Sequence, residues 1–353
     1  MPLFSPFQLG PLTLPNRIVM APLTRRRAGQ GKIPTDLNAL HYEQRASAGL
    51  IISESTEVDP HSGGDVPTRP GIFNQHHVEG WRKVTDRVHD AGGRIFLQLS
   101  HLGRASHPLL MSAGQPPIGP SAIAAEGSAY TSEGSKPFPV PRELDLAEIA
   151  VLVDQFAHGA VLARQAGFDG VEIQAANGYL IDTFLRDGSN KRSDAYGGTA
   201  VKRARFLLEI VEAVAKVWGE DRVGVHLSPL NSFNGMSDSD PVAHFVKIAK
   251  LLDNYGLSYL HVIEPAQNPK ITPLIRGAFR GPLILSSGYS QRLAEDAIFS
   301  RAGDLVAFGE AFIANPDLPH RFRVGAPLNP ADRATFYSGG PKGYTDYPAL
   351  QSV

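Results

Sequence analysis

Residues 145–175 read DLAEIAVLVDQFAHGAVLARQAGFDGVEIQA, a helix followed by a strand, and this unit decides the fold. Asp145 and Glu148 stand at the spacing of a capping box, which predicts that a helix begins there. Gly167 is expected to end that helix, because glycine tolerates the left-handed conformation of a helix C-terminus. The apolar, β-branched run at 171–173 then predicts a short buried strand.

The same unit of helix, glycine and apolar strand recurs along the chain. With the apolar runs at 18–20 and 282–285 included it predicts eight strands, at residues 18–20, 50–52, 94–97, 171–173, 223–225, 259–263, 282–285 and 305–308. Short apolar strands separated by helices are typical of a parallel sheet buried on both faces, and eight of them predict an α/β fold of the (β/α)8 TIM-barrel type. A doubly wound sheet is the alternative, but neither GxGxxG nor GxxxxGK[ST] follows a strand.

Two stretches interrupt this pattern. Residues 103–144 are rich in Pro, Gly and Ser, and we expect a long loop excursion after the third strand that caps one end of the barrel. On this interpretation residues 1–353 form a single TIM-barrel domain. The polar stretch 179–199 brings Arg186, Asp187, Lys191 and Arg192 close together, and a charge run of this kind predicts a solvated surface turn.

Composition excludes several classes of function. The 353 residues include 34 Lys and Arg against 35 Asp and Glu, so the electrostatic footprint of a nucleic-acid-binding or membrane-docking protein is missing. There is no cysteine, which excludes disulfides, thiolate metal sites and cysteine nucleophiles. We expect a cytoplasmic monomer or homodimer that acts on a small-molecule substrate, with no nucleic-acid partner and no membrane span.

Polar residues gather where the predicted strands end, which is where such barrels carry out chemistry. Ser286, Ser287, Gly288 and Gly309 follow the last two strands, where barrels often bind a phosphate through backbone N–H groups. Gln174, Asn177 and Tyr179 follow the fourth strand and offer two amides and a phenol; they could grip a carbonyl and deliver a proton, or cap the next helix. No metal-ligand spacing such as HExxH is present, so no metal is expected.

Several long stretches identify a family. They are LPNRIVMAPLTRRRA, GWRKVTDRVHDAGGRIFLQLSHLGR, AGFDGVEIQAANGYLIDTFLRDGSNKRSDAYGG, FNGMSDSDP, VAFGEAFIANPDLP and GYTDYP. In these the chain resembles, along nearly its whole length, the old yellow enzyme family of FMN-dependent ene-reductases. The resemblance implies FMN at the carboxyl end of the barrel and NADPH or NADH as its reductant. An α,β-unsaturated carbonyl or nitro compound would then take hydride from flavin N5.

The resemblance also implies roles for individual residues. Pro22, Leu23 and Thr24 would lie along the flavin edge, while Gln98 and the backbone of Ser55 would meet its pyrimidine ring. Tyr179 would give the proton, and Asn177 with Gln174 would grip the activating carbonyl. The remaining residues expected to bind cofactor are His226, Ser287, Gly288, Gly309 and Glu310.

Three of these positions depart from the family pattern. Gln174 replaces a histidine, and an amide cannot become cationic, so the carbonyl should be polarised less. His226 replaces an arginine that supports the anionic reduced flavin, and histidine carries a positive charge only conditionally. Glu310 replaces an arginine beside the flavin phosphate, which predicts weakened FMN binding.

Two functions therefore remain open from the sequence. The first is an FMN-dependent, NAD(P)H-using ene-reductase with Tyr179 as the acid. The second is a family member that binds flavin weakly or not at all. It would catalyse a non-redox isomerisation, cyclisation or addition on a carbonyl compound, or only bind one. The changes at Gln174, His226 and Glu310 motivate this alternative.

Overall fold

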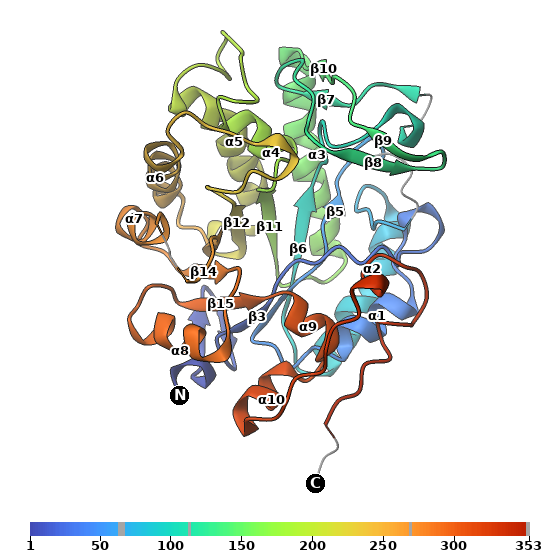
Figure 1. Cartoon of the computed structure of the whole chain (residues 1–353), viewed down its shortest axis with the longest axis vertical. Coiled ribbons are helices and arrows are strands. Elements are labelled where there is room, and N and C mark those ends of the chain that lie inside the picture. The colour runs from blue at the N-terminus through green and yellow to red at the C-terminus, as the bar shows by residue number, and fades with distance from the viewer. Residues whose placement is uncertain (63–67, 112–113, 268–269, 351–353) are drawn as a thin grey trace.

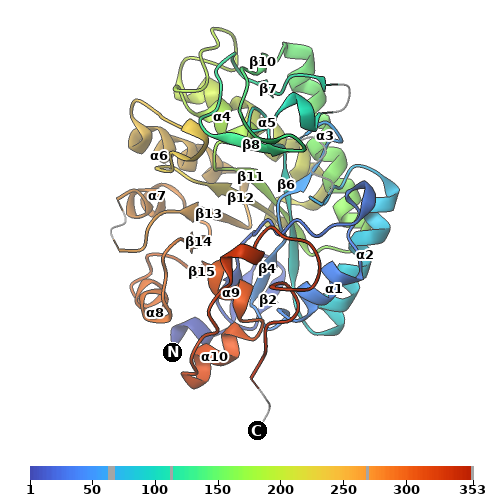
Figure 2. The same cartoon turned by 45° about the vertical axis from the view of Figure 1, so that its right-hand side comes forward.

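Eight parallel strands close into a barrel, each pairing with the next along the chain and the last with the first. The structure is a computed structural model that describes residues 1–62, 68–111, 114–267 and 270–350. The strands are β3 (Ile18–Met20), β4 (Leu50–Ile52), β6 (Ile95–Ser100), β11 (Gly170–Ala175), β12 (Val223–Leu227), β13 (Tyr259–Ile263), β14 (Leu283–Ser286) and β15 (Leu305–Phe308). The predicted (β/α)8 barrel is confirmed, and its helices form the outer ring (Figures 1 and 2).

Helices connect successive strands on the outside of the barrel. They are α1 (Asp36–Glu43), α2 (Gln75–Asp90), α3 (Leu146–Gln165), α5 (Ala200–Trp218), α6 (Pro241–Leu252), α7 (Thr272–Ala278) and α8 (Gln291–Phe299), with α9 (Glu310–Ala314) and α10 (Leu318–Val324) after the last strand. The capping box of α3 is present, with the Asp145 side chain accepting from the Glu148 N–H. The sequence pattern missed α7, whose seven residues are too few to show a clear period.

Successive side chains along each strand point alternately outward and inward, which divides the core into an outer and an inner part. Outward side chains such as Leu97, Val171 and Val225 pack against the helices, while the opposite residues point into the barrel. The amino end of the interior is filled by Phe96 and Tyr259, whose ring centroids lie 5.9 Å apart. The hairpin of β1 (Phe7–Leu9) and β2 (Leu12–Leu14) packs its leucines against the same inner cluster.

Polar side chains occupy the inner positions nearer the carboxyl ends of the strands. Gln98, Glu172, Gln174, His226 and His261 are all buried and alternate with apolar outward residues. Register sets their neighbours, because Gln98 pairs with Glu172, Gln174 with His226, and His226 with His261. The barrel therefore carries a polar layer above an apolar plug.

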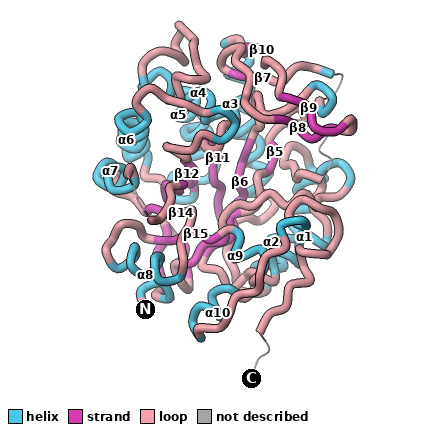
Figure 3. The backbone as a smooth tube through the Cα atoms, in the orientation of Figure 1, coloured by secondary structure: helices cyan, strands magenta, loops and turns pink. Residues whose placement is uncertain are grey.

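The excursion at 103–144 contains short strands that the sequence pattern did not predict. They are β7 (Ile118–Gly119), β8 (Ser128–Thr131), β9 (Gly134–Pro137) and β10 (Arg142–Glu143). The pair β8–β9 forms an antiparallel hairpin, drawn in magenta in Figure 3, and Gly134 adopts a φ of 90° where the chain turns. Strands of two to four residues are too short to show the period-two alternation that identifies a strand from sequence.

The interpretation of residues 179–199 as a solvated surface turn was wrong. Helix α4 (Leu180–Leu185) is buried along its length, and the Nε of Arg186 donates to the Asp182 carboxylate at 3.0 Å. Arg192 is buried as well, and donates to the backbone carbonyl of Leu144 at 2.6 Å. Both guanidinium groups therefore bind acceptors inside the protein, and Arg192 ties the excursion to the barrel.

Helix α3 is, by length and composition alone, apolar enough to cross a membrane. In the structure its Ile149, Leu152 and Phe156 are buried in the outer core, and the helix packs against α2 and α5. The apolar run is thus explained by packing on the barrel.

Candidate active site

A cavity of about 490 Å³ lies at the carboxyl ends of the strands. Eight of the residues predicted to bind cofactor or substrate line it: Pro22, Leu23, Asn177, His226, Ser287, Gly288, Gly309 and Glu310. Thr24, Ser55, Gln98, Gln174 and Tyr179 are outside this lining, and the following contacts place them.

Gln98 is the centre of the buried polar layer. Its Nε2 donates to Glu172 Oε1 at 2.7 Å and to His226 Nδ1 at 3.1 Å, and its Oε1 accepts from Gln174 Nε2 at 3.1 Å. Both ends of the Gln98 amide are therefore occupied by protein groups. The amide nitrogen of Gln174 makes one donation, to Gln98, out of the two that an amide nitrogen can make.

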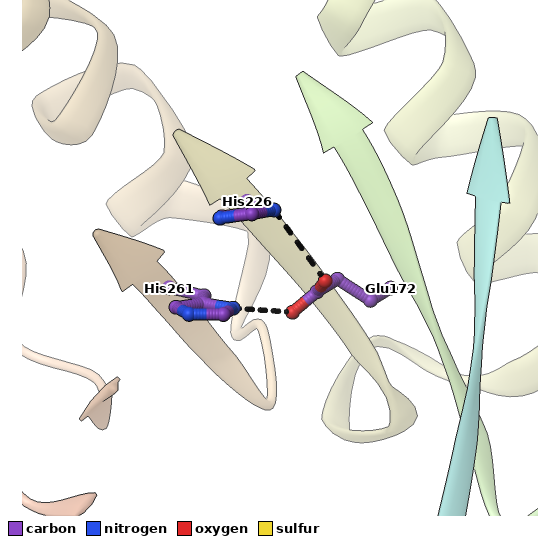
Figure 4. A group of neighbouring side chains, drawn as sticks. All are labelled: Glu172, His226 and His261. Carbon is purple, nitrogen blue, oxygen red and sulfur yellow. Dashed lines mark hydrogen bonds and ion pairs between the residues drawn. The ribbon is translucent and has the colours of Figure 1, made fainter. Parts of the chain in front are cut away.

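The rings of His226 and His261 stack with centroids 4.0 Å apart and planes 14° from parallel, and both rings face Glu172 (Figure 4). His261 Nδ1 donates to Glu172 Oε2 at 3.0 Å. His226 Nδ1 accepts from Gln98, so a neutral His226 carries its proton on Nε2. The Nε2 atoms of both histidines are buried without a partner in the described part of the chain. The pair thus offers one unused donor and one unused acceptor.

The environment keeps both imidazoles uncharged at neutral pH. Burial lowers the pKa of His226 to about 3; the adjacent His261 lowers it too, while Glu172 acts in the opposite direction. Burial likewise lowers the pKa of His261 to about 3 and raises the pKa of the Glu172 carboxyl. His226 is therefore a hydrogen-bonding group rather than a permanent cation.

Glu172, His226 and His261 are also the right residue types for a metal site, with ligand atoms within 4.8 Å of one another. An imidazole lone pair lies in the plane of its ring, so two stacked, nearly parallel rings do not aim at one ion. This geometry gives no support to a metal, and the expectation of a metal-free site stays a prediction.

Asn177 and Tyr179 lie on the tight turn after β11. Asn177 has a φ of 61°, and the next residue, Gly178, has a φ of 73°. A Cβ on Gly178 would come within 2.8 Å of the backbone carbonyl oxygen of Phe233, so the turn requires glycine there. Asn177 Oδ1 accepts from Asn231 Nδ2 at 2.9 Å, and no described residue accepts from the Asn177 amide nitrogen.

Tyr179 is the N-cap residue of α4 and lines a second cavity, of about 460 Å³, beside Arg26 and Arg69. Thr24 lies next to this group, with its Oγ1 at 3.5 Å from a guanidinium nitrogen of Arg69. Ser55 is buried, and its hydroxyl donates to Ser100 Oγ at 2.7 Å.

Glu310 does not present a bare negative charge. Both oxygens accept from Arg333, at 2.8 Å from its terminal nitrogen and 3.3 Å from its Nε, and the pair is exposed to solvent. Sequence reasoning missed this compensation, because Arg333 lies 23 residues further on, outside the strand pattern. Ser287 and Gly288 are exposed beside it, with φ values of 94° and 76°.

Sequence reasoning also missed Glu172 and His261. Both interrupt apolar strands, GVEIQA and YLHVI, at inward positions. A charged or titratable residue inside an apolar strand is itself a signal, because burying such a group without a partner is costly.

This geometry defines an α/β-barrel protein with a small-molecule cavity at the carboxyl ends of its strands and a hydrogen-bonded polar layer beneath it. The chain belongs to the NADH:flavin oxidoreductase / NADH oxidase family, whose model matches residues 2–329. It is therefore an oxidoreductase of the old yellow enzyme type, which confirms the resemblance seen in the sequence.

Individual relatives agree over the whole chain. It is 41% identical over 365 residues to 12-oxophytodienoate reductase 2 of Arabidopsis thaliana, covering 100% of this chain and 96% of that protein. It is 42% identical to a probable flavin mononucleotide-dependent alkene reductase of Leishmania infantum, covering 99% and 97%. The solved structure of morphinone reductase in complex with tetrahydroNAD matches with a TM-score of 0.95 and 46% identity, covering 99% and 98%. The general function is thus that of a flavin-dependent ene-reductase.

Proposed function

We propose that this protein reduces the C=C bond of α,β-unsaturated carbonyl or nitro compounds, with Tyr179 supplying the proton. The observation that carries the proposal is the turn after β11. It presents Asn177 to the cavity at the barrel mouth and Tyr179 to the second cavity. A hydrogen-bond donor and a phenol are thereby placed two residues apart on one rigid turn.

The cavity at the barrel mouth fits FMN by its chemistry. Its wall includes His226, whose unpartnered Nε2–H suits a ring carbonyl or nitrogen, while Gly309 leaves room where a Cβ would lie 3.3 Å from Leu23. When bound, FMN would accept hydride from the nicotinamide and supply it to the alkene. The residues proposed to hold it are Pro22, Leu23, Thr24, Ser55, Gln98, His226, Ser287, Gly288, Gly309 and Glu310.

Asn177 is the principal group for the substrate carbonyl in this proposal. Its oxygen is fixed by Asn231, so the orientation of its amide nitrogen is set before substrate binds. Gln174 uses one of its two amide N–H groups on Gln98, so the second would be the group that joins Asn177 at the carbonyl. Donors held in place stabilise the negative charge that develops on the carbonyl oxygen as hydride arrives.

The finer assignments belong to the same proposal. NADPH or NADH would be the reductant, and the relative solved with tetrahydroNAD supports a nicotinamide site. We also propose a cytoplasmic monomer or homodimer that binds neither nucleic acid nor membranes.

The visible spectrum of the purified protein tests the proposal. We expect a flavin spectrum, with or without added FMN, that NADPH bleaches under anaerobic conditions and 2-cyclohexen-1-one restores. A protein that takes up no FMN, or that transforms the enone without NADPH, would contradict it and favour the non-redox alternative.

A further inference from the structure

The cavity beside Tyr179 is unusual in its charge. Apolar walls come from residues such as Leu102, Leu110 and Phe138, yet two guanidinium groups, those of Arg26 and Arg69, line the same space. They come from different loops, after β3 and after β5 (Thr56–Glu57). A cavity with this lining would hold an apolar molecule that also carries a charged group.

Arg26 is the middle member of three consecutive arginines, and the other two have structural roles. Arg25 donates to the backbone carbonyl of Gly343 at 2.7 Å, and Arg27 donates to that of Thr335 at 2.7 Å. The Glu54 carboxylate accepts from the backbone N–H of Arg25 at 3.0 Å and of Arg26 at 3.3 Å. With a left-handed φ of 55°, Arg26 directs its side chain away from these carbonyls and into the cavity lining.

Among the described residues neither cavity arginine forms a salt bridge, although the buried Glu54 and Glu57 carboxylates act on Arg69 from a greater distance. Arg69 is only 5% exposed, and its Nε has no hydrogen-bond partner among the described residues. The Nε of Arg26 is also buried and has no hydrogen-bond partner among the described residues. Burial lowers the pKa of Arg26, and the like charge of Arg69 lowers it further. A buried guanidinium beside a half-buried one of the same charge costs free energy, and an anion bound between them would lower that cost.

We propose that Arg26 and Arg69 form a binding site for an anionic oxygen group, a carboxylate or phosphate, on a reactant whose reacting end lies beside Tyr179. The planar fork of arginine matches such groups, and two forks from different loops can hold one anion from two sides. The proposal rests on the ene-reductase function and narrows it. Glu126, the acidic residue in the same lining, is exposed, so its opposing field is screened by solvent.

Two sources of the anion are consistent with this chemistry. One is a carboxylate on the alkene, which would make the protein a reductase of unsaturated acids that also carry a carbonyl. The other is a phosphate of the nicotinamide reductant. The two are separated by which reactant loses affinity when an arginine is removed.

The test compares 4-oxocyclohex-2-ene-1-carboxylate with its methyl ester in the FMN-loaded enzyme. Arg26→Gln and Arg69→Gln are each expected to lower kcat/KM for the acid about tenfold and to change that for the ester less than twofold. Arg69→Lys, which keeps the charge, should recover part of the loss. Arg292→Gln, an exposed arginine on α8, is the matched control.

The KM for NADPH or NADH is measured with the same variants. If the anion is a phosphate, KM for NADPH or NADH rises about tenfold while the ratio of acid to ester stays as in the wild type. The proposal is overturned if Arg26→Gln and Arg69→Gln each keep two values within twofold of the wild type. These are the ratio of kcat/KM for the acid to kcat/KM for the ester, and the KM for the nicotinamide.

A binding measurement keeps this test separate from the proposed function. Calorimetry with the saturated 4-oxocyclohexane-1-carboxylate and with its methyl ester needs no turnover. Tighter binding of the acid that both variants abolish would support the anion site even in a protein that reduces neither alkene. Equal binding of acid and ester by the wild type, together with an unchanged nicotinamide KM in the variants, would overturn it.

Discussion

The two sides of the proposed cofactor site are built differently. The inner region, formed by Gln98, Glu172, Gln174, His226 and His261, is buried and joined by hydrogen bonds of 2.7 to 3.1 Å. The outer region, formed by Ser287, Gly288, Gly309 and Glu310, lies on turns after β14 and β15 and is largely exposed. The inner region is held by strand register, whereas the outer region is held by turn geometry and solvent.

Because of this difference, a substitution costs more free energy in the inner region than in the outer region. In the inner region a lost partner leaves a buried polar group unsatisfied, at about 1–3 kcal/mol for each group. In the outer region water replaces a lost partner. The departure from the family pattern at His226 is accordingly absorbed into a network, while that at Glu310 is balanced by an exposed ion pair with Arg333.

The largest effect is expected at Tyr179, on the turn that follows the inner-region strand β11. Tyr179→Phe should slow reoxidation of the flavin by an enone about a thousandfold, since a general acid typically contributes 10²–10⁴-fold. Reduction by NADPH should stay within about twofold, because the proton is needed only with the alkene. Stopped-flow absorbance measures the two half-reactions separately. Equal slowing of both would mean that Tyr179 only positions other groups.

Glu172→Ala should destabilise the protein by about 3 kcal/mol, because it leaves the buried donors of Gln98 and His261 without an acceptor. Urea unfolding followed by circular dichroism measures this loss. Glu172→Gln, which keeps one acceptor and the side-chain shape, should lose less than half as much. An unchanged unfolding midpoint in Glu172→Ala would show that the network adds nothing to stability.

The buried histidines predict a pH effect of about 2 kcal/mol for each ring between pH 7 and pH 5. An unfolded histidine gains a proton below about pH 6.5, whereas folded His226 does so only near its pKa of about 3. The flavin-free protein should therefore lose stability as the pH falls from 6.5 toward 3. In His226→Asn the loss from pH 7 to 5 should be smaller by about 2 kcal/mol.

Urea unfolding at the two pH values measures that difference. His76→Asn, which alters an exposed histidine of α2, is the matched control. The same pH dependence in wild type and His226→Asn would contradict the assignment of His226 as a buried neutral ring.

The smallest effect is expected in the outer region. Glu310→Gln removes one half of an exposed ion pair, and such pairs contribute little, so the Kd for FMN should change by no more than about fivefold. Fluorescence quenching of FMN by the flavin-free protein measures the Kd. A change of a hundredfold would show that Glu310 controls the phosphate site directly and would remove the contrast between the regions.

Much of the fold was predictable because it repeats. All eight barrel strands were located from apolar runs, and the capping box at Asp145 and Glu148 is present. The short strands of the excursion and α7 were missed because they have too few residues to show a period. The description of residues 1–353 as one domain stays a prediction.

The residues that line the cavities were more predictable than the contacts they make, and their roles stay predictions. Strand ends located Asn177, Tyr179 and Ser287 at the cavities, because parallel strands all end at one edge of the barrel. The partners of Gln174 and Glu310 were not predictable, since Gln98 and Arg333 reach them from 76 and 23 residues away.

By itself the sequence determined the barrel, its family and which residue types face the mouth, because periodicity and strand order are local properties of the chain. Only the tertiary structure decided the electrostatics. It buried two histidines in a neutral stack, matched Glu310 with Arg333, and left Arg26 and Arg69 facing one cavity. Charge and pKa depend on burial and on neighbours distant in sequence, and folding alone brings those together.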